Sequence, residues 1–157
     1  MWTLRCPKLE DTRELGRALA EVATEPVRVA LSGDMGAGKT SFAQGVGDGL
    51  GVFEPVVSPT FVLVSEYRAW VPLLHADVWR LTEPELAEIG LEETIEGWSG
   101  VALVEWADRF PTILPHDHLR VQITIGDDEV RVIAVSATGP AHDAVLARWR
   151  EAWDARS

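Results

Sequence analysis

Apolar residues along the chain form two kinds of segment. Val27–Leu31 and Val101–Val104 are short, mostly apolar runs rich in β-branched residues, a pattern typical of strands buried on both faces of a sheet. Lys39–Val46 can form a helix directly after a glycine-rich stretch. Asp11, with a glutamate three residues later, has the signature of a helix N-cap, and apolar residues follow at helical spacing as far as Val22. The pattern predicts strands and helices that alternate along the chain.

The rest of the chain adds two hairpins and two helices. Four segments with strand character form the predicted hairpins: Phe61–Tyr67 with Val71–Ala76, and Leu119–Ile125 with Val130–Val135. A capping signal at Thr82 begins a brief helix that ends at Gly90, and Pro140–Ala155 closes the chain as a helix. Four glycines are expected to end or loosen the helix that starts at Lys39: Gly45, Gly47, Gly49 and Gly51. Together these elements predict an α/β fold with a mixed sheet.

The size and composition of the chain indicate one domain. With 157 residues, 46% of them hydrophobic, the chain can build one substantial core, so we expect a single domain over residues 1–157. No apolar stretch approaches the length of a membrane span, and Met1–Pro7 lacks the apolar segment of a secretory signal. The single cysteine, Cys6, cannot form an internal disulfide and is expected to be a structural thiol. We therefore expect a cytoplasmic protein without a membrane partner.

The charge of the chain argues against direct contact with nucleic acid. Its formal net charge is −11 at pH 7, so the average field of its surface repels a polyanion such as RNA. Acidic residues also cluster locally, as in Glu92–Glu96 and Asp127–Glu129. Such runs are usually solvated faces, although one of them can also dock on a basic partner.

One octet carries most of the chemistry. Residues 33–40 read GDMGAGKT, the spacing G-x-x-x-x-G-K-[ST] of a backbone loop that wraps the phosphates of a nucleoside triphosphate. Gly33, Gly36 and Gly38 let amide N–H groups approach phosphate oxygens, Lys39 supplies a positive charge, and the Thr40 hydroxyl suits Mg²⁺. A strand precedes the loop and a helix follows it, so the motif stands in the context that it requires. We expect a P-loop NTPase-like three-layer α/β fold with a mixed, largely parallel central sheet.

Two acids at predicted strand ends are candidates to complete the site. Glu105 ends the run Val101–Val104 and is the favoured Mg²⁺ ligand, while Asp77 is a second-shell ligand or orients the attacking water. Either acid can instead be a solvated strand end. The adjacent Trp106 is placed to stack near the nucleotide.

Other polar residues leave alternatives open. Thr60 lies in a proline-marked segment where a hydroxyl can sense the γ-phosphate, but an ordinary turn threonine fits the spacing almost as well. His75, His116 and His118 suggest a metal site, yet histidines without a full ligand set are more often structural.

Four motifs in order, GDMGAGKT, SPTF, HADVWRL and VEW, give the chain a family resemblance. Over about the first 115 residues it resembles the bacterial TsaE family, also called YjeE, the small ATPases needed for threonylcarbamoyladenosine modification of transfer RNA. The chain departs from the family pattern at Trp79, where a tyrosine is common, and at Ala76, where phenylalanine or methionine is frequent. The tail beyond Leu119 carries no transferable motif.

The resemblance implies specific roles for residues. It implies ATP binding by the loop residues Gly36, Ala37, Gly38, Lys39, Thr40 and Ser41. It also implies Mg²⁺ held by Thr40 and Glu105, an active-site role for Asp77, and matches for Thr60 and for Thr12, a threonine near the nucleotide. Its implied partners are the proteins TsaB and TsaD, through which the chain reaches tRNA indirectly.

Three functions remain in competition. The first is a Mg²⁺-dependent ATPase that regulates a tRNA-modifying assembly and hydrolyses slowly when alone. The second is a small-molecule P-loop kinase, although the sequence has no compact arginine-rich lid segment. The third is a binding module that uses ATP only to fix its shape. A GTPase is disfavoured because no Asn-Lys-x-Asp element follows the loop.

Overall fold

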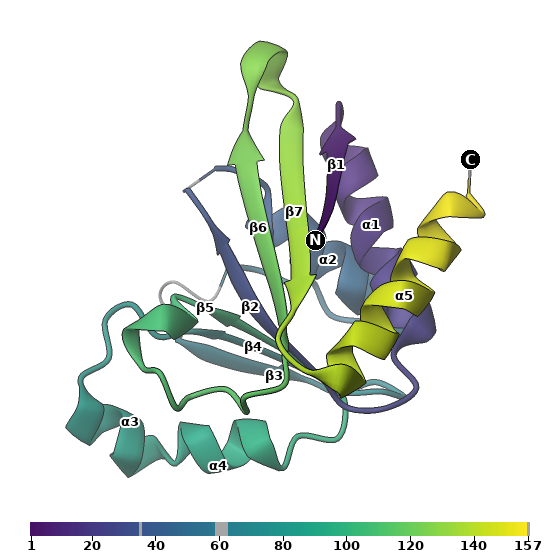
Figure 1. The fold of residues 1–157 in the computed structure, drawn as a ribbon. Helices are drawn as coiled ribbons and strands as arrows, with labels where there is room; N and C mark the ends of the chain where they lie inside the picture. The colour runs from purple at the N-terminus through teal and green to yellow at the C-terminus, as the bar shows by residue number, and fades with distance from the viewer. Residues whose placement is uncertain (35, 59–62, 157) are drawn as a thin grey trace.

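A seven-stranded sheet forms the centre of the computed structural model in Figure 1, which describes residues 1–34, 36–58 and 63–156. The strand order is β1-β7-β6-β2-β5-β4-β3. The strands are β1 (Trp2–Cys6), β2 (Val27–Gly33), β3 (Val64–Tyr67), β4 (Leu73–Asp77), β5 (Val101–Glu105), β6 (Leu119–Ile125) and β7 (Arg131–Ala137).

The middle of the sheet is parallel. Strand β2 pairs in parallel with β5 and β6, and β4 pairs in parallel with β5, whereas β3, β7 and β1 join the edges antiparallel. Every residue of β4 and β5 is buried, as the apolar run Val101–Val104 of β5 requires. Leu31, Glu105 and Asp77 are neighbours in register, so the carboxyl ends of β2, β5 and β4 lie side by side. The predicted mixed, largely parallel sheet is confirmed.

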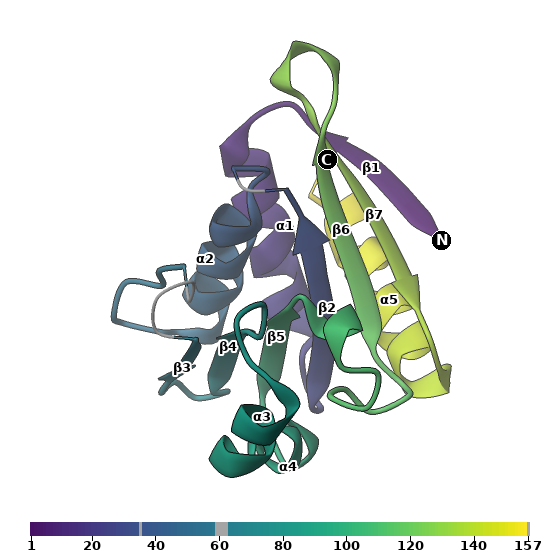
Figure 2. The ribbon, with the colours of Figure 1, turned by 90° about the vertical axis from the view of Figure 1, so that its left-hand side faces the viewer.

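Helices cover both faces of this sheet (Figures 1 and 2). Three helices pack on one face: α1 (Leu9–Val22), α2 (Lys39–Leu50) and α5 (Pro140–Asp154). Two short helices, α3 (Glu83–Ile89) and α4 (Leu91–Glu96), pack on the other face. Single 3-10 turns occur at η1 (Ala107–Arg109) and η2 (Asp127–Glu129). The arrangement confirms the predicted three-layer α/β fold.

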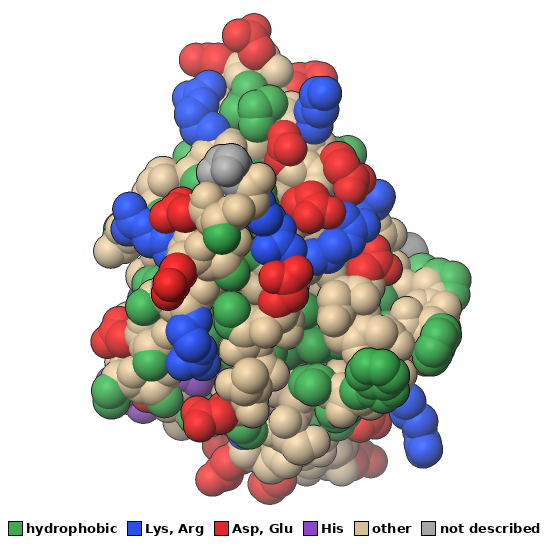
Figure 3. Space-filling model, turned by 90° about the vertical axis from the view of Figure 1, so that its right-hand side faces the viewer, with side chains coloured by type: hydrophobic (Ala, Val, Ile, Leu, Met, Phe, Trp, Pro, Cys, Tyr) green, Lys and Arg blue, Asp and Glu red, His purple; other side chains and the backbone are tan. Residues whose placement is uncertain are grey.

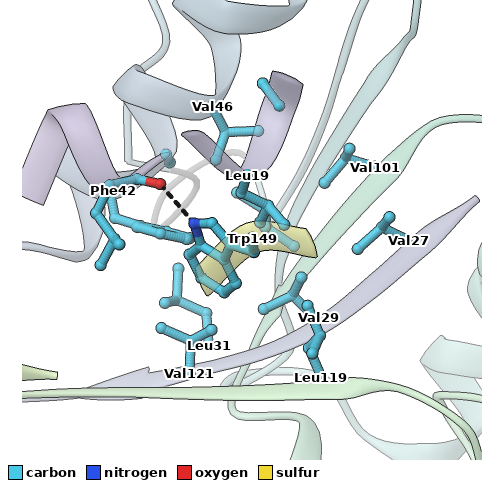
Figure 4. Close-up of a cluster of buried hydrophobic side chains, with 14 of the residues drawn as sticks. Leu19, Val27, Val29, Leu31, Phe42, Val46, Val101, Leu119, Val121 and Trp149 are labelled. Atoms are coloured by element: carbon cyan, nitrogen blue, oxygen red, sulfur yellow. Dashed lines mark hydrogen bonds between the residues drawn. The ribbon is translucent and has the colours of Figure 1, made fainter. Parts of the chain in front are cut away.

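Trp149 fills the centre of the core between α1, α2, α5 and the sheet (Figure 4). Its ring is fully buried and lies 5.9 Å from the ring of Phe42 on α2. Its indole N–H donates to the carbonyl oxygen of Leu15 at 3.0 Å, so the one polar atom of the side chain is satisfied. The C-terminal helix is thereby fixed against the helix that follows the glycine-rich loop.

The helix that starts at Lys39 is longer than predicted. It continues through Gly45, Gly47 and Gly49 to Leu50, and Gly51 caps it in the left-handed conformation. The expectation that the glycines end the helix is confirmed for Gly51 and wrong for Gly45, Gly47 and Gly49, which lie within it. Gly45 and Gly49 face α1, where the two helices cross closely. A Cβ at Gly45 would stand 1.9 Å from the carbonyl oxygen of Arg13, so only glycine fits at this crossing.

Other boundaries also differ from the predictions. Helix α1 begins at Leu9, and Asp11 is not the N-cap of this helix. The Asp11 carboxylate instead accepts the backbone N–H of Lys8 at 2.9 Å.

The predicted capping of α3 is confirmed, since the Thr82 hydroxyl accepts the N–H of Glu85 at 3.3 Å. Strand β1 and helix α4 were not predicted. The start of the predicted strand Phe61–Tyr67 lies partly outside the described residues, and β3 begins at Val64.

The face formed by α1 and α5 carries both signs of charge (Figure 3). Arg17 on α1 bonds Glu10 at 3.1 Å and Asp48 of α2 at 3.2 Å, and Arg156 bonds Glu21 at 2.6 Å. Exposed pairs of this kind each contribute at most about 1 kcal/mol. Among the residues that the structure describes, no helix combines the length and apolar character needed to cross a membrane.

Candidate nucleotide-binding site

A cleft of about 370 Å³ opens at the carboxyl ends of β2, β4 and β5. This is the edge of a parallel sheet at which α/β proteins bind their ligands. The lining residues come from α1, the glycine-rich loop, α2, the segment between α2 and β3, and the ends of β4 and β5 with the residues that follow them. They are Leu9, Gly36, Gly38, Lys39, Thr40, Ser41, Ser58, Asp77, Trp79, Arg80, Glu105 and Trp106. Eight of the residues expected from sequence therefore meet in one cleft.

The loop delivers the start of α2 to this cleft. Gly38 precedes the helix with φ of 116°, a left-handed conformation that favours glycine, and its carbonyl accepts the N–H of Phe42 at 2.9 Å. The first-turn amides of an α-helix have no partner within the helix, and here they belong to residues that line the cleft. Together with the helix dipole, they favour an anion at this position.

Glu105 is the most connected group of the site. It is 5% exposed, and its two oxygens have different partners: Oε1 lies 3.1 Å from Nζ of Lys39, and Oε2 lies 2.8 Å from Nε2 of His75. Burial opposes ionisation of the carboxyl group, but the hydrogen bond from His75 and the charge of Lys39 outweigh it, so the pKa of Glu105 is lowered. The carboxylate is therefore charged and oriented at neutral pH.

Asp77 stands next to Glu105 at the end of β4. The two residues are direct neighbours in register, and Asp77 is 6% exposed. Its Oδ1 accepts the backbone N–H of Trp79 at 2.9 Å, which fixes the carboxylate at the turn after the strand. Neither acid is a solvated strand end, so that alternative is wrong for both.

The oxygen groups of the cleft fit a hard divalent cation. Mg²⁺ binds carboxylate and hydroxyl oxygens together with phosphate oxygens and water, and Thr40, Asp77 and Glu105 supply such groups from three different elements. Thr40 and Glu105 are the residues that would hold the ion.

An aromatic wall borders the acidic end of the cleft. The rings of Trp79 and Trp106 lie 4.3 Å apart at 41°, and Nζ of Lys39 lies 6.0 Å from the Trp106 ring centre. Arg109 packs its guanidinium 5.5 Å from the Trp79 ring. Trp106 was expected here. Trp79 and Arg80 were missed as lining residues, although their position directly after the strand that ends in Asp77 is a signal that points to them.

Four further residues were predicted for the site: Thr12, Gly33, Ala37 and Thr60. Ala37 is buried and Gly33 ends β2. Thr12 is also buried, with its Cγ2 atom 3.7 Å from where a Cβ of Gly38 would be. None of the three lines the cleft itself. Thr60 lies outside the described residues, so its role stays a prediction.

The histidines do not form a metal cluster. His75 is fully buried against Glu105, and the His118 ring bonds the carbonyl of Pro115 at 2.8 Å. Over residues 1–34, 36–58 and 63–156, no group of three or more His, Cys, Asp or Glu side chains is arranged to hold a metal. Cys6 is likewise buried, and burial raises the pKa of its thiol to about 11, as expected for a structural cysteine.

Comparison with known proteins gives a consistent result. A family model described as "Threonylcarbamoyl adenosine biosynthesis protein TsaE" matches residues 6–133. The tRNA threonylcarbamoyladenosine biosynthesis protein TsaE of a Nostoc species is 42% identical over 126 residues, covering 78% of this chain and 77% of the relative. The protein of the same name from Bacillus subtilis is 39% identical over 135 residues, covering 85% and 84%. The crystal structure of Bacillus subtilis YdiB superposes with a TM-score of 0.83 at 32% identity, covering 96% of this chain and 94% of YdiB.

Proposed function

Because the chain belongs to the TsaE family of threonylcarbamoyladenosine biosynthesis proteins, we propose that it is the Mg²⁺-dependent ATPase of that tRNA-modifying machinery. The observation that carries the proposal is the meeting of Lys39, Glu105 and the start of α2 in one cleft. An anion-binding helix start, a lysine and two buried acids are the parts that phosphoryl transfer to water requires.

Each residue then has one task. The amides of Gly38–Ser41 and the ammonium of Lys39 bind the phosphates. Thr40 and Glu105 would hold Mg²⁺, which would supply further positive charge to neutralise the phosphates. Asp77 accepts a hydrogen bond from the attacking water and orients it toward the γ-phosphorus. The tryptophans beside Lys39 exclude bulk water from the phosphate end of the cleft.

The proposal extends to partners. TsaB and TsaD are the protein partners, and tRNA is reached only through the complex. The net charge of −11 supports this arrangement, because a chain with that charge needs another surface to bring it to RNA. We further propose that the protein acts in the cytoplasm.

The first test separates binding from hydrolysis. Lys39→Ala is expected to abolish ATP hydrolysis, because the charge facing the β- and γ-phosphates is lost. Asp77→Asn keeps the size of the side chain and an acceptor for the Trp79 N–H, so it is expected to bind ATP normally and hydrolyse it about a hundredfold more slowly. Phosphate release with TsaB and TsaD present measures the rate, and calorimetry measures ATP binding.

Lys8→Ala is the matched control, since Lys8 is the only other lysine of the chain and is exposed. It is expected to match the wild type in both measurements. Hydrolysis at the wild-type rate in both site variants would rule out this site. Phosphate transfer to a small acceptor instead of release would favour a kinase, and binding without turnover in the complete mixture would favour a module that uses ATP only for its shape.

A further inference from the structure

Arg131, the first residue of β7, reaches the outer side of the phosphate-binding loop. Its Nε donates to the carbonyl oxygen of Ala37 at 3.3 Å, and its Nη2 donates to that of Gly36 at 3.4 Å. Its Nη1 donates to the carbonyl of Glu129 at 2.9 Å, within the β6–β7 turn. Its Cγ lies 3.9 Å from where a Cβ of Gly38 would stand. One side chain thus joins two successive loop carbonyls to a hairpin that is distant in sequence.

These bonds determine which way the loop amides face. In a trans peptide, a carbonyl and the following N–H point in opposite directions. The Ala37 carbonyl faces Arg131, so the N–H of Gly38 faces away from it, and Gly38 lines the cleft. The N–H of Ala37 is already bonded to the carbonyl of Asp34 at 3.0 Å. Arg131 therefore favours the loop conformation that offers the Gly38 amide to an anion.

Side chains do not confine the loop at Gly36, although the next residue, Ala37, is fully buried. A Cβ added at Gly36 would meet nothing within 4 Å. A guanidinium presents its donors in a rigid fork, which can bond two carbonyls at once. The hydrogen bond from Arg131 to the Gly36 carbonyl is thus a specific restraint at a residue that neighbouring side chains leave unconfined.

We propose that Arg131 is a positioning residue for the phosphate-binding loop, and that it makes nucleotide affinity depend on the β6–β7 hairpin. This inference rests on the proposed function, since it concerns the same loop. The hairpin extends beyond the rest of the sheet (Figures 1 and 2), and Arg131 pairs in register with Ile125 of β6 and with Cys6 of β1. The restraint on the loop therefore originates in β7 and its neighbours β6 and β1, on one side of the sheet, and not in the cleft.

The test compares three arginine substitutions. Arg131→Met keeps an apolar stem against Gly38 but removes every donor, and Arg131→Lys keeps the charge without the fork. Arg148→Met is the matched control, because Arg148 on α5 bonds only the distant carbonyl of Val22, at 3.5 Å, among the described residues. Calorimetry gives the Kd of Mg-ATP and Mg-ADP, and thermal unfolding without nucleotide gives the stability of each variant.

We expect Arg131→Met to raise the Kd of both nucleotides about tenfold, equivalent to about 1.4 kcal/mol, with the unfolding temperature near that of the wild type. Arg131→Lys is expected to lie closer to Arg131→Met than to the wild type, and Arg148→Met to match the wild type. An unchanged Kd in Arg131→Met would overturn the inference. The inference would also fail if Arg131→Met lost affinity while Arg131→Lys bound as tightly as the wild type, because the positive charge alone would then suffice. If Arg131→Met does not fold, the affinity of Arg131→Lys decides. Wild-type protein that binds no nucleotide would instead contradict the proposed function.

Discussion

At the scale of single residues, His75 is the group whose surroundings most constrain its role. It has no exposed surface, and Nε2 lies 2.8 Å from Oε2 of Glu105. Within the described part of the chain, Nδ1 has no hydrogen-bond partner. A neutral ring that carries its proton on Nε2 donates to Glu105 and leaves only a lone pair unsatisfied on Nδ1. His75 is therefore a donor that orients the Glu105 carboxylate, not a metal ligand.

His75→Leu is expected to affect both stability and metal dependence. The substitution leaves Oε2 of the buried Glu105 carboxylate without its donor, so the unfolding temperature is expected to fall. It also removes the donor that orients Glu105, so the Mg²⁺ concentration for half-maximal ATP hydrolysis is expected to rise about tenfold. His75→Gln keeps an N–H donor and is expected to recover part of the loss. Identical Mg²⁺ titrations for wild type and His75→Leu would contradict this role.

At the scale of elements, the crossing of α1 and α2 is the closest contact in the helical layer. A Cβ at Gly16 would lie 2.3 Å from the carbonyl oxygen of Phe42, and one at Gly45 would lie 1.9 Å from that of Arg13. Both obstacles are backbone atoms, which cannot turn aside as a side chain can. Glycine lowers helix propensity by about 1 kcal/mol relative to alanine, and the close packing offsets that cost.

Gly45→Ala is therefore expected to destabilise the protein although alanine is the better helix former. Separation of the two helices is expected to cost about 3 kcal/mol, measured as the free energy of unfolding in urea. Gly97→Ala is the matched control, because a Cβ there has its nearest neighbour, the Glu93 carbonyl oxygen, at 3.5 Å and φ is −89°. Equal stability of both variants would show that the crossing tolerates a wider spacing.

The elements that the sequence predicted best are those whose pattern has one physical solution. A continuous apolar run such as Val101–Val104 needs burial on both faces, and β5 has it. Strand β1 escaped prediction because it is a five-residue edge strand whose partner, β7, lies near the other end of the chain. Helix α4 escaped because it spans only six residues directly after the glycine that caps α3.

The residues of the site likewise divide into those that a local pattern predicts and those that depend on the folded chain. Lys39 and Thr40 follow from a spacing that itself specifies the loop, and Asp77 and Glu105 follow from strands that end at one edge of a parallel sheet. The contacts of Arg131 and His75 depend on the strand register and side-chain packing of the folded chain. No local pattern encodes such contacts.

At the scale of the whole molecule, acid acts on stability in two opposite ways. The net charge is −11 at pH 7 and the sequence pI is about 4.7, so lowering the pH toward that value relieves self-repulsion. Asp117 acts in the other direction. Its carboxylate accepts the N–H groups of Ala141 and His142 at the start of α5, at 2.8 and 3.0 Å. Burial alone would raise the pKa of Asp117, but these bonds and the one with the His142 ring lower it.

The His142 ring extends this connection to the sheet. Its Nε2 accepts the backbone N–H of Arg28 on β2 at 3.0 Å, and its Nδ1 lies 2.7 Å from Oδ1 of Asp117. Because Nε2 is the acceptor, the proton of a neutral ring lies on Nδ1 and is donated to Asp117. The carboxylate of Asp117 thus holds the last helix of the chain on the central strand.

The contribution of Asp117 is expected to disappear in acid. A carboxyl group whose folded pKa is lowered stabilises the protein above its unfolded pKa, and that stability is lost as the pH falls through the folded value. Asp117→Asn is therefore expected to be about 1 kcal/mol less stable than wild type at pH 7 and pH 5, because the charge is removed and only one of the two accepting oxygens remains. The gap is expected to close as the pH falls below 3.8, the ordinary pKa of an aspartate side chain.

Urea unfolding at pH 7, 5, 4 and 3 measures this difference in stability. Asp143→Asn is the control, because Asp143 is an exposed acid in the first turn of α5. It is expected to lose only a few tenths of a kcal/mol. A gap between wild type and Asp117→Asn that stays constant down to pH 3 would mean that the charge of Asp117 does not hold α5 in place.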